Sequence, residues 1–127
     1  MADKLNKDLL RNLPKTDLHC HLDGSLRVST ILELASEQGV KLPYTDEKKL
    51  RNYLVVSEKC ESLLDYLKGF AVTTSVLQTY DGLKRAAYEL VLDAADENVR
   101  YLEVRFAPTL HLDQGLNSTQ VVEAVLE

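Results

Sequence analysis

Apolar residues recur along most of this chain with the spacing of an α-helix. The pattern i, i+3, i+4, i+7 is typical of helices that bury one face. It predicts helices over residues 28–38, 45–54, 58–77 and 81–97, and a further helix that begins near residue 118 or 119. Residues 1–12 are polar, and we expect them to form a mobile or short helical arm.

Turn and cap residues mark where several of these helices should begin or end. Gly39 fits the position after the last turn of the first helix, where a left-handed backbone is common. Asp46 and its neighbours supply an N-cap and early acidic residues for the second helix. Asn98 is a suitable residue to end the helix over 81–97, which is the most regular of the set.

Residues 15–21 alternate with a period of two instead, which predicts a β-strand. One face of this strand carries polar residues, Asp17, His19 and His21. The opposite face carries Leu18, Cys20 and, just beyond the strand, Leu22. We expect the second face to pack in the core, whereas core packing does not explain an acid and two histidines on the first.

A second strand is predicted over residues 99–108. One face carries Val99, Tyr101, Glu103 and Arg105, and the other carries Leu102, Val104 and Phe106. Glu103 and Arg105 are two residues apart and opposite in charge. They could form a solvated strand face, or an ion pair inside a barrel, where a buried charge needs a partner.

The order strand, several helices, strand, helix suits a parallel sheet with long crossovers. We predict an α/β fold that is the N-terminal part of a (β/α)8 TIM-type barrel, with about two barrel strands plus several helices. A complete barrel needs roughly 250 residues, and the chain has 127. Residues 1–127 are therefore expected to be a fragment of a single barrel domain, with residues 1–12 as its arm.

Composition and charge exclude several classes of function. The chain is 45% hydrophobic, has a net charge of −5 and shows no cluster of basic residues, which argues against nucleic acid as a partner. It has no apolar run of membrane-spanning length, and its N-terminus lacks the apolar segment of a secretion signal. Two distant cysteines, Cys20 and Cys60, do not form a disulfide framework and favour the cytoplasm.

The segment around His19 and His21 is the strongest candidate for chemistry. Residues i and i+2 of a strand point to the same side, so both imidazoles can reach one metal ion. Asp23 adds a carboxylate where the chain leaves the strand, and Gly24 and Ser25 follow it. A lone His-x-His also occurs by chance, but the flanking breakers and the acid favour a metal site at a strand end.

Three segments together resemble the adenosine deaminase family of the metal-dependent amidohydrolase superfamily. They are PKTDLHCHLDGSL at residues 14–26, LKRAAYE at 83–89 and YLEVRFAP at 101–108. The resemblance implies a barrel with one Zn²⁺ ion at its mouth and a purine nucleoside as substrate. The implied reaction is zinc-dependent hydrolytic deamination of adenosine, and of deoxyadenosine, to inosine and ammonia.

The resemblance also implies roles for individual residues. His19 and His21 match the first two metal ligands, and His21 would also lie beside the substrate. Asp23 occupies the place of an acid that binds a ribose hydroxyl, which favours a nucleoside over free adenine. Tyr66 and Phe70 resemble an aromatic pair on a helix over the substrate pocket, although core packing would explain them equally well.

Other residues of the family pattern do not occur in these 127 residues. The third metal histidine, the late aspartate, the histidine that orients the attacking water and the general-acid Glu would follow residue 127. We therefore assign no catalytic residue in this chain, and we read His111 as a loop residue without a metal role. We expect the chain alone to be inactive and to self-associate through exposed barrel edges. The alternatives are an adenine or modified-adenosine deaminase, and a non-catalytic oligomerising fragment of the fold.

Overall fold

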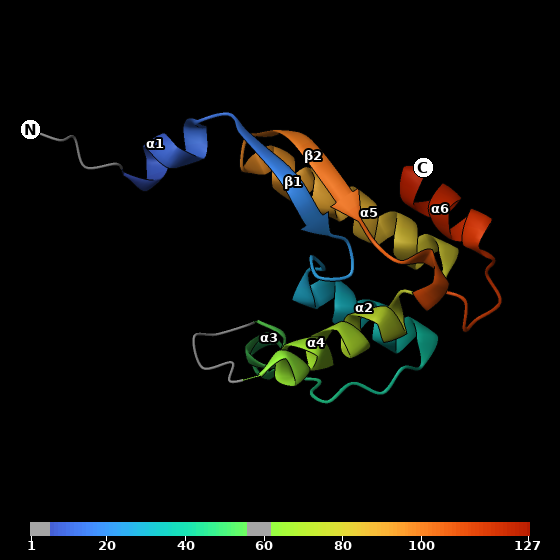
Figure 1. The fold of residues 1–127 in the computed structure, drawn as a ribbon. Helices are drawn as coiled ribbons and strands as arrows, with labels where there is room; N and C mark the ends of the chain where they lie inside the picture. Colours follow the sequence, from blue (N-terminus) through green and yellow to red (C-terminus); the bar gives the residue numbers. More distant parts are fainter. Residues whose placement is uncertain (1–5, 56–61) are drawn as a thin grey trace, which may run out of the picture.

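The computed structural model describes residues 6–55 and 62–127, without the side chains of residues 64–66. Its elements are α1 (Lys7–Asn12), β1 (Lys15–His21), α2 (Val28–Gln38), α3 (Glu47–Leu54), α4 (Leu63–Val76), α5 (Tyr80–Asp96), β2 (Val99–Arg105), the 3-10 turn η1 (Pro108–Leu110) and α6 (Ser118–Leu126). The predicted order of strand, helices, strand and helix is confirmed (Figure 1).

Local capping explains where the helices begin and end. The side chain of Asp46 accepts from the backbone N of Lys49, so α3 begins two residues later than predicted. Gly39 follows α2 with φ 66°, as expected. Asn98 follows α5 with φ 60°, a left-handed conformation that Asn tolerates better than most residues. Pro108 lies in η1, and β2 already ends at Arg105.

The two strands pair in parallel, and their register departs from simple alternation. Asp17 lies opposite Leu102, and Cys20 lies opposite Val104. Two residues of β1, Leu18 and His19, therefore face a single residue of β2, which is a β-bulge. The backbone N–H of His19 donates to Asp17 Oδ1 at 3.0 Å, so the Asp17 side chain supports the bulge.

The bulge corrects the predicted faces of β1. Leu102 and Val104 share one face of β2, so their partners Asp17 and Cys20 also share one face. Asp17 thus lies on the side opposite to that predicted, away from the histidines. Leu18 is 59% exposed, so its predicted core packing was also wrong. A second register shift lies between Lys15 and Thr16. Their partners are Val99 and Tyr101, so at this point β2 carries the extra residue.

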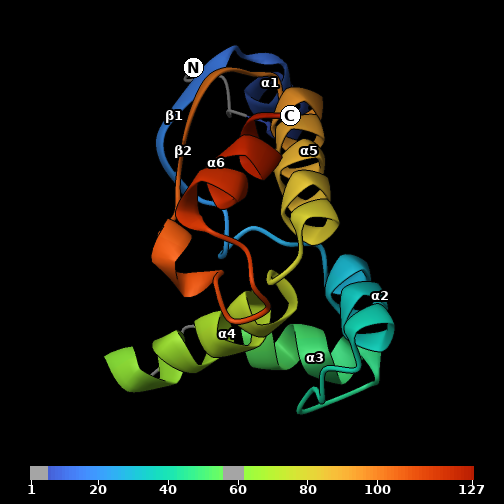
Figure 2. The same ribbon diagram turned by 90° about the vertical axis from the view of Figure 1, so that its right-hand side faces the viewer.

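Helix α5 lies along one face of the sheet, and α6 lies beside α5 (Figure 2). Helices α2, α3 and α4 gather at the end where both strands finish (Figure 1). Helices α2 to α6 and the loops next to them supply the fully buried core side chains: Leu22, Ile31, Leu50, Val76, Leu77, Leu83 and Val121. The other face of the sheet is exposed, as Leu18 and Tyr101 show.

Polar contacts fix the start of α2 against α5. Arg27, at the N-cap of α2, makes a two-pronged ion pair with Asp93, with Nε–Oδ2 at 3.1 Å and Nη2–Oδ1 at 2.5 Å. The Thr30 hydroxyl, which is buried, donates to Glu89 Oε2 at 2.5 Å. The α2 end of the loop between β1 and α2 is therefore anchored to α5. Within the described ranges no helix is both long and apolar enough to cross a membrane.

Candidate functional site

His19 and His21 lie at the carboxyl end of β1, on the exposed face of the sheet. Their Nε2 atoms are 3.1 Å apart, and their rings are tilted by 47°. The bulge places the two rings on this face and turns Asp17 away from it. Two nitrogens this close either share one hydrogen or direct their lone pairs at one cation.

The nitrogen separation fits a zinc ion. Two nitrogens at 2.0–2.1 Å from one tetrahedral zinc are about 3.3–3.4 Å apart, close to the observed 3.1 Å. Imidazole is also a preferred zinc ligand. Among the residues that the structure describes, no group of three or more His, Cys, Asp or Glu side chains could hold a metal. As ligands, His19 and His21 would therefore supply only two of the at least three that such a site normally has.

Asp23 lies in the turn that follows β1. The turn is closed by the backbone N–H of Gly24, which donates to His21 O at 3.2 Å, and by the Ser25 hydroxyl, which donates to the same oxygen at 2.6 Å. Asp23 is only 6% exposed, and its Oδ1 atom is buried without a hydrogen-bond partner. His21 Nδ1 is 3.7 Å from this oxygen, too far for a hydrogen bond. The His21 ring thus has Nδ1 toward Asp23 and Nε2 toward His19.

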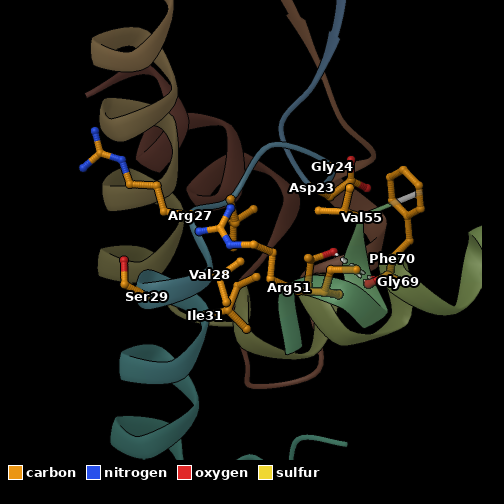
Figure 3. A pocket seen from close by; sticks show the side chains of 13 residues that line it. Asp23, Gly24, Arg27, Val28, Ser29, Ile31, Arg51, Val55, Gly69 and Phe70 are labelled. Atoms are coloured by element: carbon orange, nitrogen blue, oxygen red, sulfur yellow. Dashed lines mark hydrogen bonds between the residues drawn. The ribbon is translucent and has the colours of Figure 1, made fainter. Parts of the chain in front are cut away.

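A cavity of about 560 Å³ opens beside Asp23. Its walls come from the β1–α2 loop and from α2, α3 and α4, as Figure 3 shows. Apolar side chains such as Val28 and Ile31 line most of it, with the Arg51 guanidinium beside them. Arg27 points away, toward α5, where it pairs with Asp93. A largely apolar cavity with one buried carboxylate suits a flat ligand that carries a hydroxyl group.

Phe70 connects the cavity to the histidines. Its ring packs edge-on against His21, with centroids 6.1 Å apart and planes at 79°. A Cβ atom added to Gly24 would lie 3.4 Å from two Phe70 ring carbons and 3.4 Å from His21 Cβ. The structure thus brings His21, Asp23 and Phe70 together, and their binding roles stay predictions. The side chain of Tyr66 lies outside the described residues.

The charged residues on the exposed face of β2 do not pair with each other. Glu103 accepts a hydrogen bond from the Tyr101 hydroxyl at 2.9 Å, and this bond raises the pKa of Tyr101. Arg105 Nη2 donates to the Leu18 carbonyl at 3.2 Å. Among the described side chains no ion pair joins Glu103 to Arg105, and whether a complete barrel would enclose this face stays a prediction.

His111 follows η1 and is a loop residue, as predicted, but it is fully buried. Its Nδ1 lies 2.9 Å from the Leu77 carbonyl, and its ring lies against Phe106. Burial lowers the pKa of His111, although the Leu77 carbonyl and the Asp23 charge oppose that shift. The burial of His111 could not be predicted, because a single histidine in a loop has no periodic pattern around it.

Comparison with known proteins agrees with this geometry. Residues 14–127 match the family model described as Adenosine deaminase. The chain is 51% identical over 117 residues to an adenosine deaminase from Clostridium botulinum (strain 657 / Type Ba4), which covers 92% of this chain and 35% of that protein. The chain thus spans about a third of the length of the curated relatives that it matches.

Solved structures give the same picture. An adenine deaminase from Arthrobacter aurescens superposes with a TM-score of 0.76 at 28% identity, covering 89% of this chain and 33% of that one. An amidohydrolase from Burkholderia ambifaria, solved with bound Zn, superposes with a TM-score of 0.75 at 27% identity, covering 98% of this chain and 34% of that one.

The parallel β1–β2 pair, with polar residues at its carboxyl end, is thus part of a barrel of the amidohydrolase type. Barrels of this type place their active sites at this end of the strands. The matches along residues 14–127 then fix the family: the chain belongs to the adenosine deaminase family, whose members are hydrolytic deaminases.

Proposed function

We propose that this chain supplies two zinc ligands and the sugar-binding acid of an enzyme that hydrolyses adenosine and deoxyadenosine to inosine and ammonia. The observation that carries the proposal is the 3.1 Å separation of His19 Nε2 and His21 Nε2, beside a buried Asp23. When bound, zinc supplies a water molecule whose pKa is lowered to about 7. His19 and His21 hold the cation, and the packing of Phe70 fixes the His21 ring.

Asp23 supports a nucleoside as the substrate. A buried carboxylate without a partner is costly, and a sugar hydroxyl would give it a donor. Free adenine has no such hydroxyl. The cavity of about 560 Å³ lies within the range of about 300–1,000 Å³ that is usual for small-molecule sites. Its apolar walls suit one face of a purine.

Three other functions remain as alternatives. The likeness to the Arthrobacter aurescens adenine deaminase favours a substrate without the sugar, and a modified adenosine is a further variant. A comparison of adenosine with adenine separates a nucleoside substrate from the free base, because adenine has no sugar hydroxyl to engage Asp23. The third alternative is a non-catalytic oligomerising role through the exposed sheet face. It predicts self-association without any zinc binding.

We further propose that the 127 residues alone do not complete the reaction. Two histidines are fewer ligands than a catalytic zinc site needs, and among the described residues no third His, Cys, Asp or Glu completes a metal-binding group with them. A solution of the chain should therefore convert no adenosine above background, whereas a protein that contains the whole barrel should. The cytoplasm is our proposed location, on the basis of cysteine use alone.

Zinc titration by calorimetry tests the site directly. We expect one zinc to bind per chain, and binding to be lost in His19→Ala and in His21→Ala. Leu18→Ala is the matched control, because this exposed residue lies in the same strand and offers no ligand. If both histidine variants bind zinc as well as the unaltered chain does, the assigned ligands are refuted. An enzyme with the whole barrel that deaminates adenine faster than adenosine would refute the proposed substrate.

A further inference from the structure

Two buried atoms near the site can accept hydrogen bonds but receive none. The first is Nε2 of His111, on the loop after β2. His111 Nδ1 lies 2.9 Å from the Leu77 carbonyl, and a carbonyl only accepts, so Nδ1 carries the ring proton. In a neutral imidazole the other nitrogen, Nε2, is then a lone-pair acceptor. It is fully enclosed, because His111 has no exposed surface.

The second atom is Oδ1 of Asp23, which is also buried and unpartnered. Asp23 is close enough for its charge to raise the pKa of His111 against the effect of burial. No direct hydrogen bond or ion pair between Asp23 and His111 occurs among the described residues. Two acceptors cannot bond to each other, but one water molecule can donate one hydrogen to each.

We propose that His111 is a positioning residue for Asp23, acting through a buried water that bridges His111 Nε2 and Asp23 Oδ1. This inference rests on the proposed role of Asp23 in binding a sugar hydroxyl. The bridge fixes the carboxylate and leaves its second oxygen for the ligand. His21 Nδ1, at 3.7 Å from Oδ1, can approach as well, since a carboxylate oxygen accepts more than one hydrogen bond.

The bridge would also add a third loop to a junction that already joins two. His111 binds the carbonyl of Leu77, in the turn after α4, the helix that carries Phe70. Gln78 ties the same turn to the loop after β2, because its side chain bonds Leu110 O and the Asp113 backbone N–H, at 2.9 and 3.0 Å. With the water in place, the loop after β1 joins this junction through Asp23. The same junction of loops then holds both Asp23 and the helix that carries Phe70.

Nuclear magnetic resonance of the 127-residue chain tests the bridge without any substrate. Long-range ¹H–¹⁵N correlations should show the His111 proton on Nδ1, and a long-lived water should give a cross-relaxation signal to the ring. In Asp23→Ala the water loses a partner, and this signal should vanish. A proton on Nε2, no water signal, or a signal that persists in Asp23→Ala would overturn the proposal.

Ligand titration then tests the positioning role. His111→Asn keeps an N–H donor for Leu77 but removes the Nε2 acceptor. We expect adenosine to bind roughly tenfold more weakly, as for one lost charge-assisted hydrogen bond, and adenine to bind equally well. Gln78→Leu is the control, because it loosens the same junction without facing Asp23, and it should leave the ratio of the two affinities unchanged.

The two proposals fail in different ways. If the unaltered chain binds neither purine, the proposed function loses support, while the water measurement still decides the bridge. If adenosine binding falls equally in His111→Asn and Gln78→Leu, the role of His111 is purely structural and the inference is wrong.

Discussion

Position 24 needs a small residue, we predict, because two side chains approach it closely rather than because of its backbone conformation. Its φ is not among the positive values found in the described residues. An added Cβ would lie 3.4 Å from two Phe70 ring carbons and from His21 Cβ. Optimal contacts between carbon atoms are about 3.5–4.0 Å. Gly24→Ala should therefore fit after a small movement of the Phe70 ring.

Gly24→Val should not fit. Its two methyl carbons extend about 1.5 Å beyond Cβ, into the space of Phe70 and His21. Overpacking of this kind typically costs about 1–3 kcal/mol. Because His21 is one of the two walls, its ring should also move and zinc should bind more weakly. Phe70→Ala would empty the space and relieve the clash, so the two substitutions should be strongly coupled.

Urea unfolding of Gly24→Val, Phe70→Ala and the double variant measures this coupling. We expect an interaction energy of about 1–3 kcal/mol, within the range seen for residues in contact. Gly69→Ala is the control, because its added Cβ would meet the nearest atom only at 3.7 Å, in Leu54. If Gly24→Val and Phe70→Ala are additive within about 0.5 kcal/mol, as for distant residues, the close-contact explanation is wrong.

Three further predictions concern stability, each measured by urea unfolding. Leu50→Ala, at a side chain with no exposed surface, should lower the free energy of unfolding by about 2–5 kcal/mol. Leu18→Ala, at 59% exposure, should change it by less than about 0.5 kcal/mol. Similar costs for the two variants would contradict the assigned core. Asp46→Ala removes the N-cap of α3 and should cost about 1 kcal/mol, and Asp46→Asn should restore most of it. The pKa of His111 is lowered by burial, so its contribution to stability is present above its unfolded pKa of about 6.5 and is lost as the pH falls toward the folded value. His111→Asn should flatten the dependence of unfolding free energy on pH in this range. If the slope of that dependence is unchanged, His111 is excluded as its cause.

The sequence predicted the helices best where a long periodic pattern coincided with a recognisable end. The helix over 28–38 has both, with Gly39 after it, and its predicted ends are those observed. Helix α3 differs by two residues, because Asp46 itself is the cap rather than part of the helix. Residues 58–61 of the helix predicted over 58–77 lie outside the described residues.

Errors arose where a single residue, rather than a pattern, decides the structure. Alternation with a period of two places Asp17 beside the histidines, because it contains no information about an inserted residue. The bulge is supported by a local hydrogen bond to the Asp17 side chain, which a hydrophobic pattern cannot show. The burial of His111 depends on Leu77, 34 residues away in the chain, and is equally hidden. That His19 and His21 lie together could be predicted, because two residues at i and i+2 of one strand are a local signal; their role as ligands stays a prediction.

The bulge in β1 also bears on insertions and deletions in this strand. Leu18 and His19 together occupy one place opposite β2, so the strand carries one residue more than its partner needs. Deleting Leu18 should restore even pairing and still leave His19 and His21 on the open face. Deleting Cys20 should instead turn one histidine toward the core, because a shift of one residue reverses the face of every later side chain. Deletions in β1 should therefore preserve the arrangement of the two histidines when they occur just before His19, and disrupt it when they occur between His19 and His21.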